Sequence, residues 1–551
     1  MKNLPSPHAS QLAHSVTKIP APVFLAALVL LSLSSAHAVD GTWKAGTGSG
    51  VWSATTNWTG NPNPVPGGAG SKVGLNTGTG GSVFVTIDGA VASRTVGTLD
   101  FGGSSIWTVA SGSGGTLTFD NSGSNAVINI EDVAAATLSN HVINAPVILN
   151  SSLIINANDP MRGLGTGAAG VISGAGSITK NGPGGLGFYF SAVNTFAGGF
   201  TLNGGEVGAS NNSSFGSGTL TLNSGSIVNT GGYRGYANTL VLGGDVTLNT
   251  AGGGSNNFSG TTTLTGSRIL TVESAVASLI GNIGESSAGY GITKTGTGSL
   301  TLSGSNTYSG TTTLTAGTMI VGNNSALGTG KTVVSGASAA TLKINSGITV
   351  GNNIVYSSSN ASSAIERVVA NSASFNVGTT GTLTSDFAGG TDNTTASLLA
   401  GSGATTLTMS FAPTATASND GSRISDVFDL SLSTSRTYVL QLTTGVVGSD
   451  PLYLGWLDGG AWVEATTGNT GTPGSLAGPH AMTWDAFVSA NGAFNATTML
   501  GAYGYDETTT TAWAVLDHNS EFALVVPEPT TLGLLGLSLT VLVALRRRRT
   551  A

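Results

Sequence analysis

The chain has 551 residues, of which 84 are glycine, 8% are charged and none is cysteine. So much glycine argues against a protein of long helices, because each glycine inside a helix costs about 1 kcal/mol relative to alanine. The absence of cysteine excludes disulfides, thiolate metal sites and a cysteine nucleophile. The formal net charge is −7, and no basic patch remains once the lysines of the N-terminus and the four arginines at 546–549 are set aside, which argues against nucleic acid as a partner.

Residues 1–38 have the organisation of a secretory signal peptide. Lys2 and Lys18 precede an apolar run over residues 23–33, and Ala36-His37-Ala38 forms an A-x-A cleavage site. The apolar run is shorter than the roughly 20 residues that a transmembrane helix needs. We therefore expect export of the chain, with Ala36 and Ala38 directing the cleavage.

Residues 39–71 place Trp43, Trp52 and Trp58 among glycines. One interpretation is a platform on which sugar rings stack against the aromatic faces. The other is a cap over the open end of a stack of strands, where apolar surface and strand edges would otherwise be exposed. We favour the cap.

Residues 72–420 consist of short runs in which apolar and polar residues alternate, separated by glycine-rich turns. In 299–303 and 311–315 this alternation places Leu300, Leu302 and Leu314 on a buried face and the hydroxyl groups outside. The pattern predicts a succession of short β-strands.

Glycine and asparagine mark the predicted turns. Glycines close the runs around residue 300, where we expect backbone with positive φ; they are Gly304, Gly310 and Gly317. Asparagine tolerates turn geometry, and its amides can hydrogen-bond from one coil to the next. We therefore expect structural ladders, and not ligand sites, at turn asparagines such as Asn144, Asn150 and Asn156.

The strand-turn unit repeats along the chain. Its best copies are residues 176–205 and 290–317, and a partial copy covers residues 257–264. The aromatic residue of each copy is Phe196, Phe258 or Tyr308, and their spacing is uneven. Uneven spacing favours a solenoid with inserted loops over a propeller, whose blades keep one length. Coils of roughly 20–25 residues give about a dozen rungs between residues 72 and 350.

Residues 292–311, ITKTGTGSLTLSGSNTYSGT, resemble the autotransporter-associated β-strand repeat, whose pattern is approximately I-T-K-x-G-x-G-x-L-x-L-x-G-x-N-x-Y-x-G-x-T. The copy that begins at Ile178 departs from it at 185–188, which read GLGF. The resemblance implies a right-handed parallel β-helix displayed outside the cell, and it does not imply an enzyme. Proteins of this kind commonly open with a W…W…NW segment, which supports the cap.

Residues 421–525 have a denser aromatic and aliphatic pattern. Runs at 436–443, 452–457 and 512–516 predict strands of a small antiparallel domain that resembles a β-sandwich. We place the boundary with the β-helix near residue 421.

Residues 526–551 carry the most specific motif in the chain. A Pro-Glu-Pro tripeptide precedes an apolar run over 532–545, and four arginines follow. An apolar run of this length before a basic cluster predicts a marginal membrane span with the arginines in the cytoplasm. The tail is similar to the PEP-CTERM sorting signal, which implies recognition by an exosortase-type transpeptidase in a Gram-negative bacterium that makes exopolysaccharide. An unprocessed C-terminal anchor is the alternative. The residues of the expected sorting signal are Pro527, Glu528, Pro529, Arg546, Arg547, Arg548 and Arg549.

A parallel β-helix can also carry a polysaccharide lyase or glycosidase, which needs carboxylates gathered on one face. Between residues 72 and 350 the charges are scattered. The acidic pair Glu131-Asp132 and the opposite charges of Asp159 and Arg162 are closest to such a cluster, and both predict solvated turns. Two lysines recur at one place in the repeat, which indicates a structural role; they are Lys180 and Lys294.

The C-terminal region offers a superficial resemblance to a hydrolase in Asp506, Asp517 and His518. No G-x-S-x-G motif precedes them, and His141 and His480 lack metal-ligand spacing. We therefore predict no catalytic, cofactor-binding or metal-binding residues.

These observations lead to one functional hypothesis and one alternative. We expect a non-enzymatic, exported structural or adhesive protein of the cell surface or extracellular matrix, sorted at the membrane through its tail. Its expected partners are an exosortase-type enzyme, the inner membrane through the C-terminal segment, and an extracellular polysaccharide. The alternative is a carbohydrate-active β-helix enzyme, or a glycan-binding module, that acts on exopolysaccharide.

Overall fold

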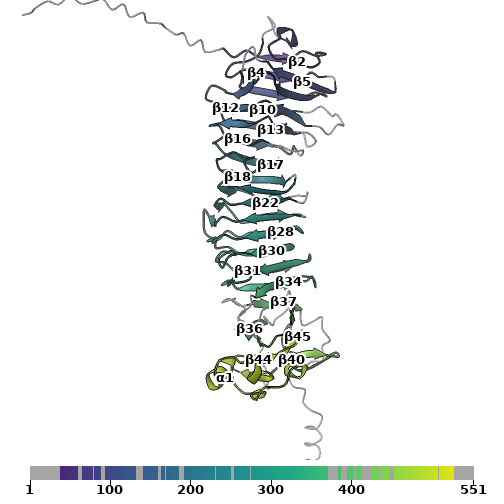
Figure 1. Ribbon diagram of the computed structural model, residues 1–551, viewed down its shortest axis with the longest axis vertical. Coiled ribbons are helices and arrows are strands. Elements are labelled where there is room, and N and C mark those ends of the chain that lie inside the picture. Colours follow the sequence, from purple (N-terminus) through teal and green to yellow (C-terminus); the bar gives the residue numbers. More distant parts are fainter. Residues whose placement is uncertain are drawn as a thin grey trace, which may run out of the picture. The chain divides into compact units, whose positions relative to one another are not determined.

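The computed structural model describes residues 37–526, except for 60–64, 79, 89–92, 132–139, 159–162, 168, 185–191, 230, 250–253, 274, 370–382, 386–393, 402–404, 413–422, 435, 446–451 and 507. The chain divides into two units, Met1–His37 and Ala38–Ala551. The second unit is a β-solenoid of about 16 turns that ends in antiparallel β-structure, which confirms the predicted fold class. Figure 1 shows its strands stacked one above another.

The described strands form four sheets. Two small sheets belong to the first turns: β2 (Gly50–Val51), β5 (Ser82–Ile87), β8 (Ile106–Ser111), β11 (His141–Asn144) and β14 (Leu164–Thr166) in one, and β6 (Ser93–Val96), β9 (Thr116–Phe119), β12 (Val147–Leu149) and β15 (Ile172–Gly174) in the other.

The longest sheet runs from the first turns to the C-terminal end. Its strands are β1 (Gly41–Trp43), β3 (Trp58–Thr59), β4 (Lys72–Leu75), β7 (Thr98–Phe101), β10 (Ala126–Ile130), β13 (Leu153–Ala157), β16 (Ile178–Asn181), β17 (Phe200–Ala209), β18 (Leu220–Asn229), β20 (Leu240–Leu242), β21 (Val246–Asn249), β23 (Thr262–Leu264), β24 (Arg268–Val272), β26 (Ile283–Glu285), β27 (Ile292–Thr295), β29 (Thr312–Leu314), β31 (Thr332–Gly336), β33 (Ile354–Ser358), β35 (Leu383–Ser385), β36 (Thr395–Gly401), β39 (Tyr438–Thr443), β42 (Gly478–His480), β43 (Ala502–Asp506) and β44 (Thr511–Leu516). After β18 the sheet divides into two columns, one through β20, β23 and β26 and one through β21, β24 and β27.

The fourth sheet begins after β18 and runs to the C-terminal end. Its strands are β19 (Tyr233–Tyr236), β22 (Ser255–Phe258), β25 (Val276–Leu279), β28 (Ser299–Leu302), β30 (Gly317–Val321), β32 (Ala340–Ile344), β34 (Ala364–Val369), β37 (Thr405–Ala412), β38 (Val427–Leu432), β45 (Ser520–Val525), β40 (Tyr453–Asp458) and β41 (Ala461–Glu464). The described helices are short: η1 (Thr55–Asn57), η2 (Ala465–Gly468), α1 (Trp484–Asn491) and α2 (Ala496–Met499).

The core consists of columns of side chains that stack from turn to turn. Parallel pairing aligns β28 with β25 on one side and with β30 on the other, so Leu302 lies between Leu279 and Val321. All three side chains are fully buried, as are the other two predicted core residues, Leu300 and Leu314. The predicted alternation of inward and outward residues is confirmed here.

The glycines of the repeat serve two different purposes. Gly317 has a φ of 69°, as predicted for a turn. Gly304 and Gly310 do not have positive φ, so that part of the prediction is wrong for them. A Cβ on Gly304 would lie 2.3 Å from the carbonyl oxygen of Gly281 on the neighbouring turn. These two glycines are needed because the backbones of successive turns approach closely, and not because of their own φ.

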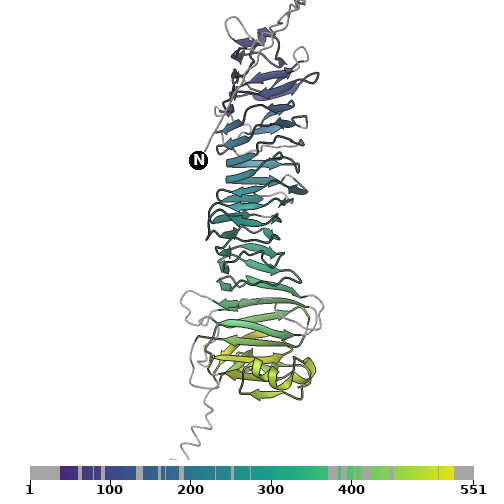
Figure 2. The same ribbon diagram turned by 90° about the vertical axis from the view of Figure 1, so that its left-hand side faces the viewer.

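Strand pairing becomes antiparallel near the C-terminal end. β35 pairs in parallel with β33 but antiparallel with β36, and β34 pairs antiparallel with β37. Both long sheets continue through this change, and Figure 2 shows the yellow-green strands that follow it. β36 and β37 lie within the segment 72–420 that the sequence assigns to the β-helix, so antiparallel structure begins before residue 421. How the chain divides into domains stays a prediction.

Candidate functional surfaces

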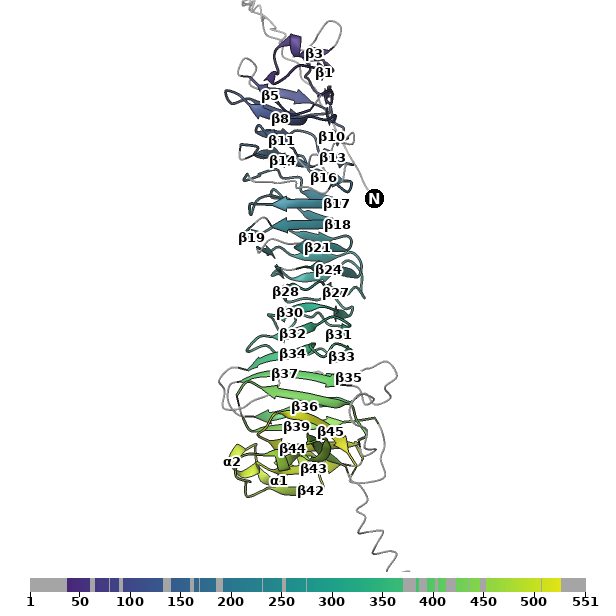
Figure 3. The same cartoon turned by 90° about the vertical axis from the view of Figure 1, so that its right-hand side faces the viewer.

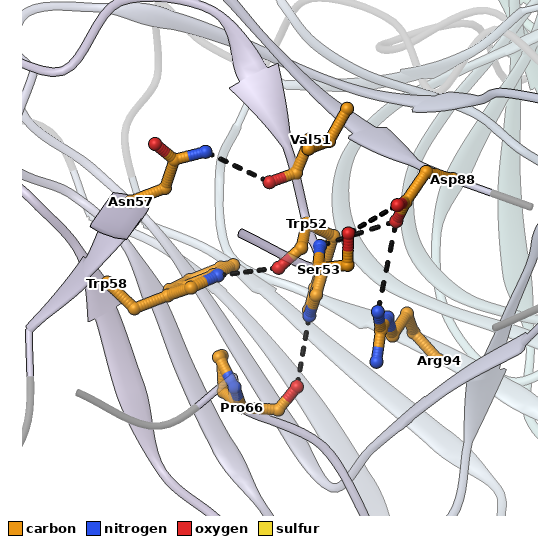
Figure 4. Close-up of polar contacts among 8 residues, drawn as sticks. All are labelled: Val51, Trp52, Ser53, Asn57, Trp58, Pro66, Asp88 and Arg94. Carbon is orange, nitrogen blue, oxygen red and sulfur yellow. Dashed lines mark hydrogen bonds and ion pairs between the residues drawn. The ribbon is translucent and has the colours of Figure 1, made fainter. Parts of the chain in front are cut away.

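The three tryptophans of the N-terminal segment are packed inside the first turn. Trp43, Trp52 and Trp58 are each 0% exposed, and the Trp58 ring lies 4.9 Å from that of Trp43 and 5.2 Å from that of Trp52, between centroids. Figure 4 shows the Trp52 indole donating to the carbonyl of Pro66 at 3.0 Å, and the Trp58 indole donating to the carbonyl of Trp52 at 2.7 Å. Rings without exposed faces cannot stack on sugars, so the burial favours the cap over the platform.

A charged group fastens the tryptophan segment to the following turn. The Asp88 carboxylate accepts hydrogen bonds from the backbone and hydroxyl of Ser53 and lies 3.8 Å from the Arg94 guanidinium. The Ser53 hydroxyl, followed by weaker contributions that include Arg94, lowers the pKa of Asp88. The carboxylate therefore stays ionised and connects Ser53 of the tryptophan segment to Arg94 of β6, which is a structural use of the charge.

Lys180 and Lys294 occupy the same position in the two best repeat copies, and both are 0% exposed. Lys180 is flanked by Ile155 and Leu202 within an aliphatic column. Its Nζ donates to the carbonyls of Gly182 and Gly204, at 2.9 and 2.7 Å, which belong to successive turns.

The Lys294 Nζ donates in the same way, to the carbonyls of Thr295, Gly296 and Ala316 at 2.7, 2.7 and 3.1 Å. Burial lowers the pKa of each lysine to about 8. Each ammonium thus connects two turns at a corner where carbonyls converge, in keeping with the structural role predicted for both.

A chain of hydrogen-bonded amides follows the outer surface of the first turns. Each asparagine side chain donates to the one on the turn before, with N···O distances of 2.8–3.1 Å, along Asn129, Asn156, Asn181, Asn203 and Asn223. Asn129 itself donates to Asp100, which pairs with Lys72 at 3.3 Å. We call these five asparagines the amide ladder.

Of the three asparagines named from the sequence, only Asn156 belongs to the amide ladder. Asn150 donates to Asp120 at 3.5 Å, and Asn144 accepts from the backbone of Ala169 at 3.3 Å. Beside the start of the ladder, a cavity of about 380 Å³ is lined by residues that include Asp40, Lys72 and Asp100. Asp40 already accepts a hydrogen bond from the backbone N–H of Lys72, and Asp100 forms an ion pair with the Lys72 side chain.

The hydrolase-like residues of the C-terminal region do not come together. Asp517 accepts from the backbone of Thr470 and Gly471, whereas the His518 Nε2 lies 2.9 Å from the carbonyl of Ala465. Asp506 accepts from the backbone of Thr508 at 2.9 Å within its own turn. Each group therefore has a local structural partner.

The two histidines considered as metal ligands from the sequence, His141 and His480, are also engaged within the fold. His141 is buried, stacks on Phe101 and accepts from the backbone N–H of Trp107 at 3.1 Å. The His480 Nε2 lies 3.0 Å from the carbonyl of Leu476. Among the residues that the structure describes, no three His, Asp or Glu side chains are grouped so that they could hold a metal ion.

Several predicted residues lie outside the described part of the chain. They are Ala36 of the cleavage site, Asp132, Asp159 and Arg162, and the sorting-signal residues Pro527, Glu528, Pro529, Arg546, Arg547, Arg548 and Arg549. Glu131, which is described, is exposed. Within the described ranges of 37–526, no helix is long and apolar enough to cross a membrane.

Sequence reasoning missed the outward hydroxyl groups that line up on the later turns, such as those of Thr271 and Thr295, whose Oγ1 atoms lie 2.8 Å apart. Their signal in the sequence is the threonine at alternate strand positions, as in ITKT at 292–295, but the register that aligns them crosses coils of unequal length. That register is visible only in the fold.

Two family models match segments of the chain. The Passenger-associated-transport-repeat matches residues 178–207 and 292–321, and the PEP-CTERM protein-sorting motif matches residues 525–549. The repeat and sorting motifs predicted from the sequence are thereby confirmed. No curated protein and no solved structure matches the chain.

Proposed function

We propose that this chain is an exported structural or adhesive protein of the cell surface or extracellular matrix. The observation that carries the proposal is the joining of a repeat-built solenoid to a PEP-CTERM motif, which begins at residue 525 as β45 ends. Together the repeats and the motif indicate an exported, sorted surface protein. The adhesive or matrix role is our inference from the architecture.

The architecture suits a spacer. Each turn buries its aliphatic side chains only against the turns next to it, so stability comes from stacking neighbours. About 16 turns at the ordinary strand spacing of about 4.8 Å extend roughly 75 Å. A stack of this kind can hold a surface away from the point at which its tail is processed.

The charges of the solenoid support a non-enzymatic role. Lys180 and Lys294 donate to backbone carbonyls, and Asp100 takes part in the contacts at the start of the amide ladder. Glu285 accepts from the backbone of Tyr290 and from Ser309. Groups with such partners serve the fold, and a catalytic acid or base needs to reach a substrate.

The sorting motif implies processing by an exosortase, which is therefore the expected partner of the tail. We further propose that residues 526–551 hold the chain in the inner membrane until processing, and that residues 1–38 direct its export. The proposed destination is the cell surface or extracellular matrix of a Gram-negative bacterium.

Fractionation of the native host tests the proposal. Full-length chain is compared with a variant that lacks residues 527–551, both detected by an antibody against the solenoid. We expect the full chain in the membrane and surface fractions and the truncated chain in the periplasm or medium. Identical fractionation of the two chains would refute the sorting role.

The alternative from the sequence is an enzyme that acts on polysaccharide, and an activity assay separates it from the structural role. The purified chain is incubated with neutral and acidic polysaccharides, and new reducing ends are measured. We expect none above a boiled-protein control. Sustained turnover on any substrate would replace the structural proposal by the enzymatic one.

A further inference from the structure

Two columns of outward side chains run along the later turns of the longest sheet. Parallel register places Ile269 beside Thr293 and Thr293 beside Thr313, and it places Thr271 beside Thr295. Figure 3 shows β24 and β27 one above the other, with β31 and β33 on the turns that follow. We call these outward residues of β24, β27 and the β29 turn the hydroxyl strip: Ile269, Thr271, Thr293, Thr295, Thr313 and Thr315.

The hydroxyl strip is uncharged and open to solvent. Ile269 is 43% exposed, and the five threonines are partly exposed. The column that contains Thr295 and Thr315 continues through Ser335, which pairs with Ser357 on the next turn. In the opposite direction it continues through Thr247 to Ser226.

The strip differs from the amide ladder in how its polar groups are used. Ladder amides donate to one another, so one N–H and the oxygen of Asn181, for example, are already engaged within the protein. Among the described residues, the Thr293 and Thr313 hydroxyls have no hydrogen-bond partner. Even the paired Thr271 and Thr295 hydroxyls keep acceptor capacity, because a hydroxyl has one donor and two acceptor positions. The strip therefore offers hydrogen bonds at regular intervals.

The dimensions of the strip favour a linear ligand. The hydroxyl strip itself covers three turns, and both of its columns continue beyond it. Adjacent strands are about 4.8 Å apart, so the longer column, from Ser226 to Ser357, spans roughly 29 Å over seven turns. The second column continues from Thr313 through Val333 and Val355, so the two columns together are about 10 Å wide and cover about 300 Å². A stable protein–protein interface needs about 800 Å² from each partner. The strip is therefore too small for a second copy of the chain, but long enough for several units of a polymer.

One end of the strip is hollowed and weakly acidic. A groove of about 350 Å³ is lined by Ser226, Asp245, Thr247, Ile269 and Thr271, among others. The groove is shallow and open, so it can seat one unit of a longer chain without enclosing it. The Asp245 Oδ1 accepts from the backbone of Ile269 at 2.8 Å, and the carboxylate has further acceptor positions for a ligand hydroxyl. Its charge repels an anionic polymer.

We propose that the hydroxyl strip binds an extended, uncharged polysaccharide chain that lies along the stack, with one sugar in the groove beside Asp245. Threonine hydroxyls exchange hydrogen bonds with sugar hydroxyls, and Ile269 and the threonine methyl groups contact the C–H surfaces of the rings. This inference gives the proposed matrix role a ligand class and a binding surface, and to that extent it rests on the proposed function.

Native gel electrophoresis of the full-length chain tests the inference. Gels contain hydroxyethyl cellulose, xyloglucan or laminarin as neutral probes, polygalacturonate as the anionic probe, or no polysaccharide. The strip variant is Thr293→Arg/Thr313→Arg. Its matched control is Thr179→Arg/Thr201→Arg, which changes two outward threonines on adjacent turns of the other repeat copy by the same charge. Circular dichroism and thermal melts verify that both variants are folded.

We expect at least one neutral probe to retard the wild type and the control. The strip variant should lose about tenfold or more in affinity for that probe. Absence of retardation by all neutral probes, retardation by polygalacturonate alone, or equal losses in the two variants would overturn the inference. So would a dimer that the strip variant abolishes, because the occupant would then be a second copy. These outcomes are independent of fractionation, so failure of the binding surface and failure of the sorting role are distinguishable.

Discussion

Replacing Leu302 by aspartate tests the solenoid core directly. Leu302 is 0% exposed and lies between Leu279 and Val321 of the neighbouring turns. Loss of a buried leucine side chain alone costs about 2–5 kcal/mol. The carboxylate adds several kcal/mol, because it has no partner in an aliphatic column. The sum is comparable with the whole stability of a typical domain, about 5–15 kcal/mol.

Thr301→Asp is the matched control, because Thr301 lies one residue away, is partly exposed and occupies an outward position of β28. It should cost about 0.5 kcal/mol or less. Leu302→Asn separates the loss of packing from the cost of the charge. Urea unfolding gives the free energies, and limited proteolysis shows whether neighbouring turns loosen, as expected when turns share one core.

The loss of stability caused by Leu302→Asp should depend on pH. Burial raises the pKa of a carboxylate in the folded state, so the penalty of Leu302→Asp should shrink as the pH falls and the group becomes neutral. Equal destabilisation by the changes at 301 and 302 would refute the alternation on which the solenoid core rests.

Three further changes test other features by urea unfolding. Burial lowers the pKa of Lys294 to about 8, so between pH 8 and 10.5 the unfolded chain binds more protons than the folded chain and the free energy of unfolding should rise with pH. Lys294→Met should remove this rise, and an unchanged pH profile would contradict the prediction. Gly296→Ala should be more destabilising than Gly289→Ala by about 2 kcal/mol or more. Both glycines have positive φ, but only at Gly296 would the new Cβ lie close to a carbonyl oxygen, 2.3 Å from that of Val272. Equal effects of the two changes would show that only φ matters. Asn181→Ala should lower the free energy of unfolding by about 1–2 kcal/mol, because it removes two hydrogen bonds of the amide ladder. A decrease below about 0.5 kcal/mol would show that the ladder does not stabilise the fold.

Alternation was enough to predict the core of the repeat, because the side-chain period of a strand is two wherever the strand lies. Leu300, Leu302 and Leu314 are buried as that rule requires. The structural role of the two repeat lysines was also recognisable, since residues that recur at one place in a repeat meet the same surroundings. Their carbonyl partners were not predictable, because those belong partly to the next turn.

Register between turns could not be read from the sequence. Coils of unequal length decide which asparagines stack, and Asn156 joins the amide ladder while Asn150 turns to Asp120. The hydroxyl strip escaped prediction for the same reason. The change to antiparallel pairing at β36 could not be predicted either. Parallel and antiparallel strands of this chain show the same alternation of apolar and polar residues, so only the identity of the neighbouring strand distinguishes them.

The C-terminal peptide of the mature protein offers the most direct test of sorting. Surface-exposed protein is isolated from the native host and from a strain without exosortase activity, and the peptide that follows β45 is identified by mass spectrometry. Processing predicts that the surface protein ends before the four arginines, and that without the exosortase the full tail stays in the membrane fraction. Surface protein that retains residues 546–549 in both strains would contradict a sorted, processed surface protein.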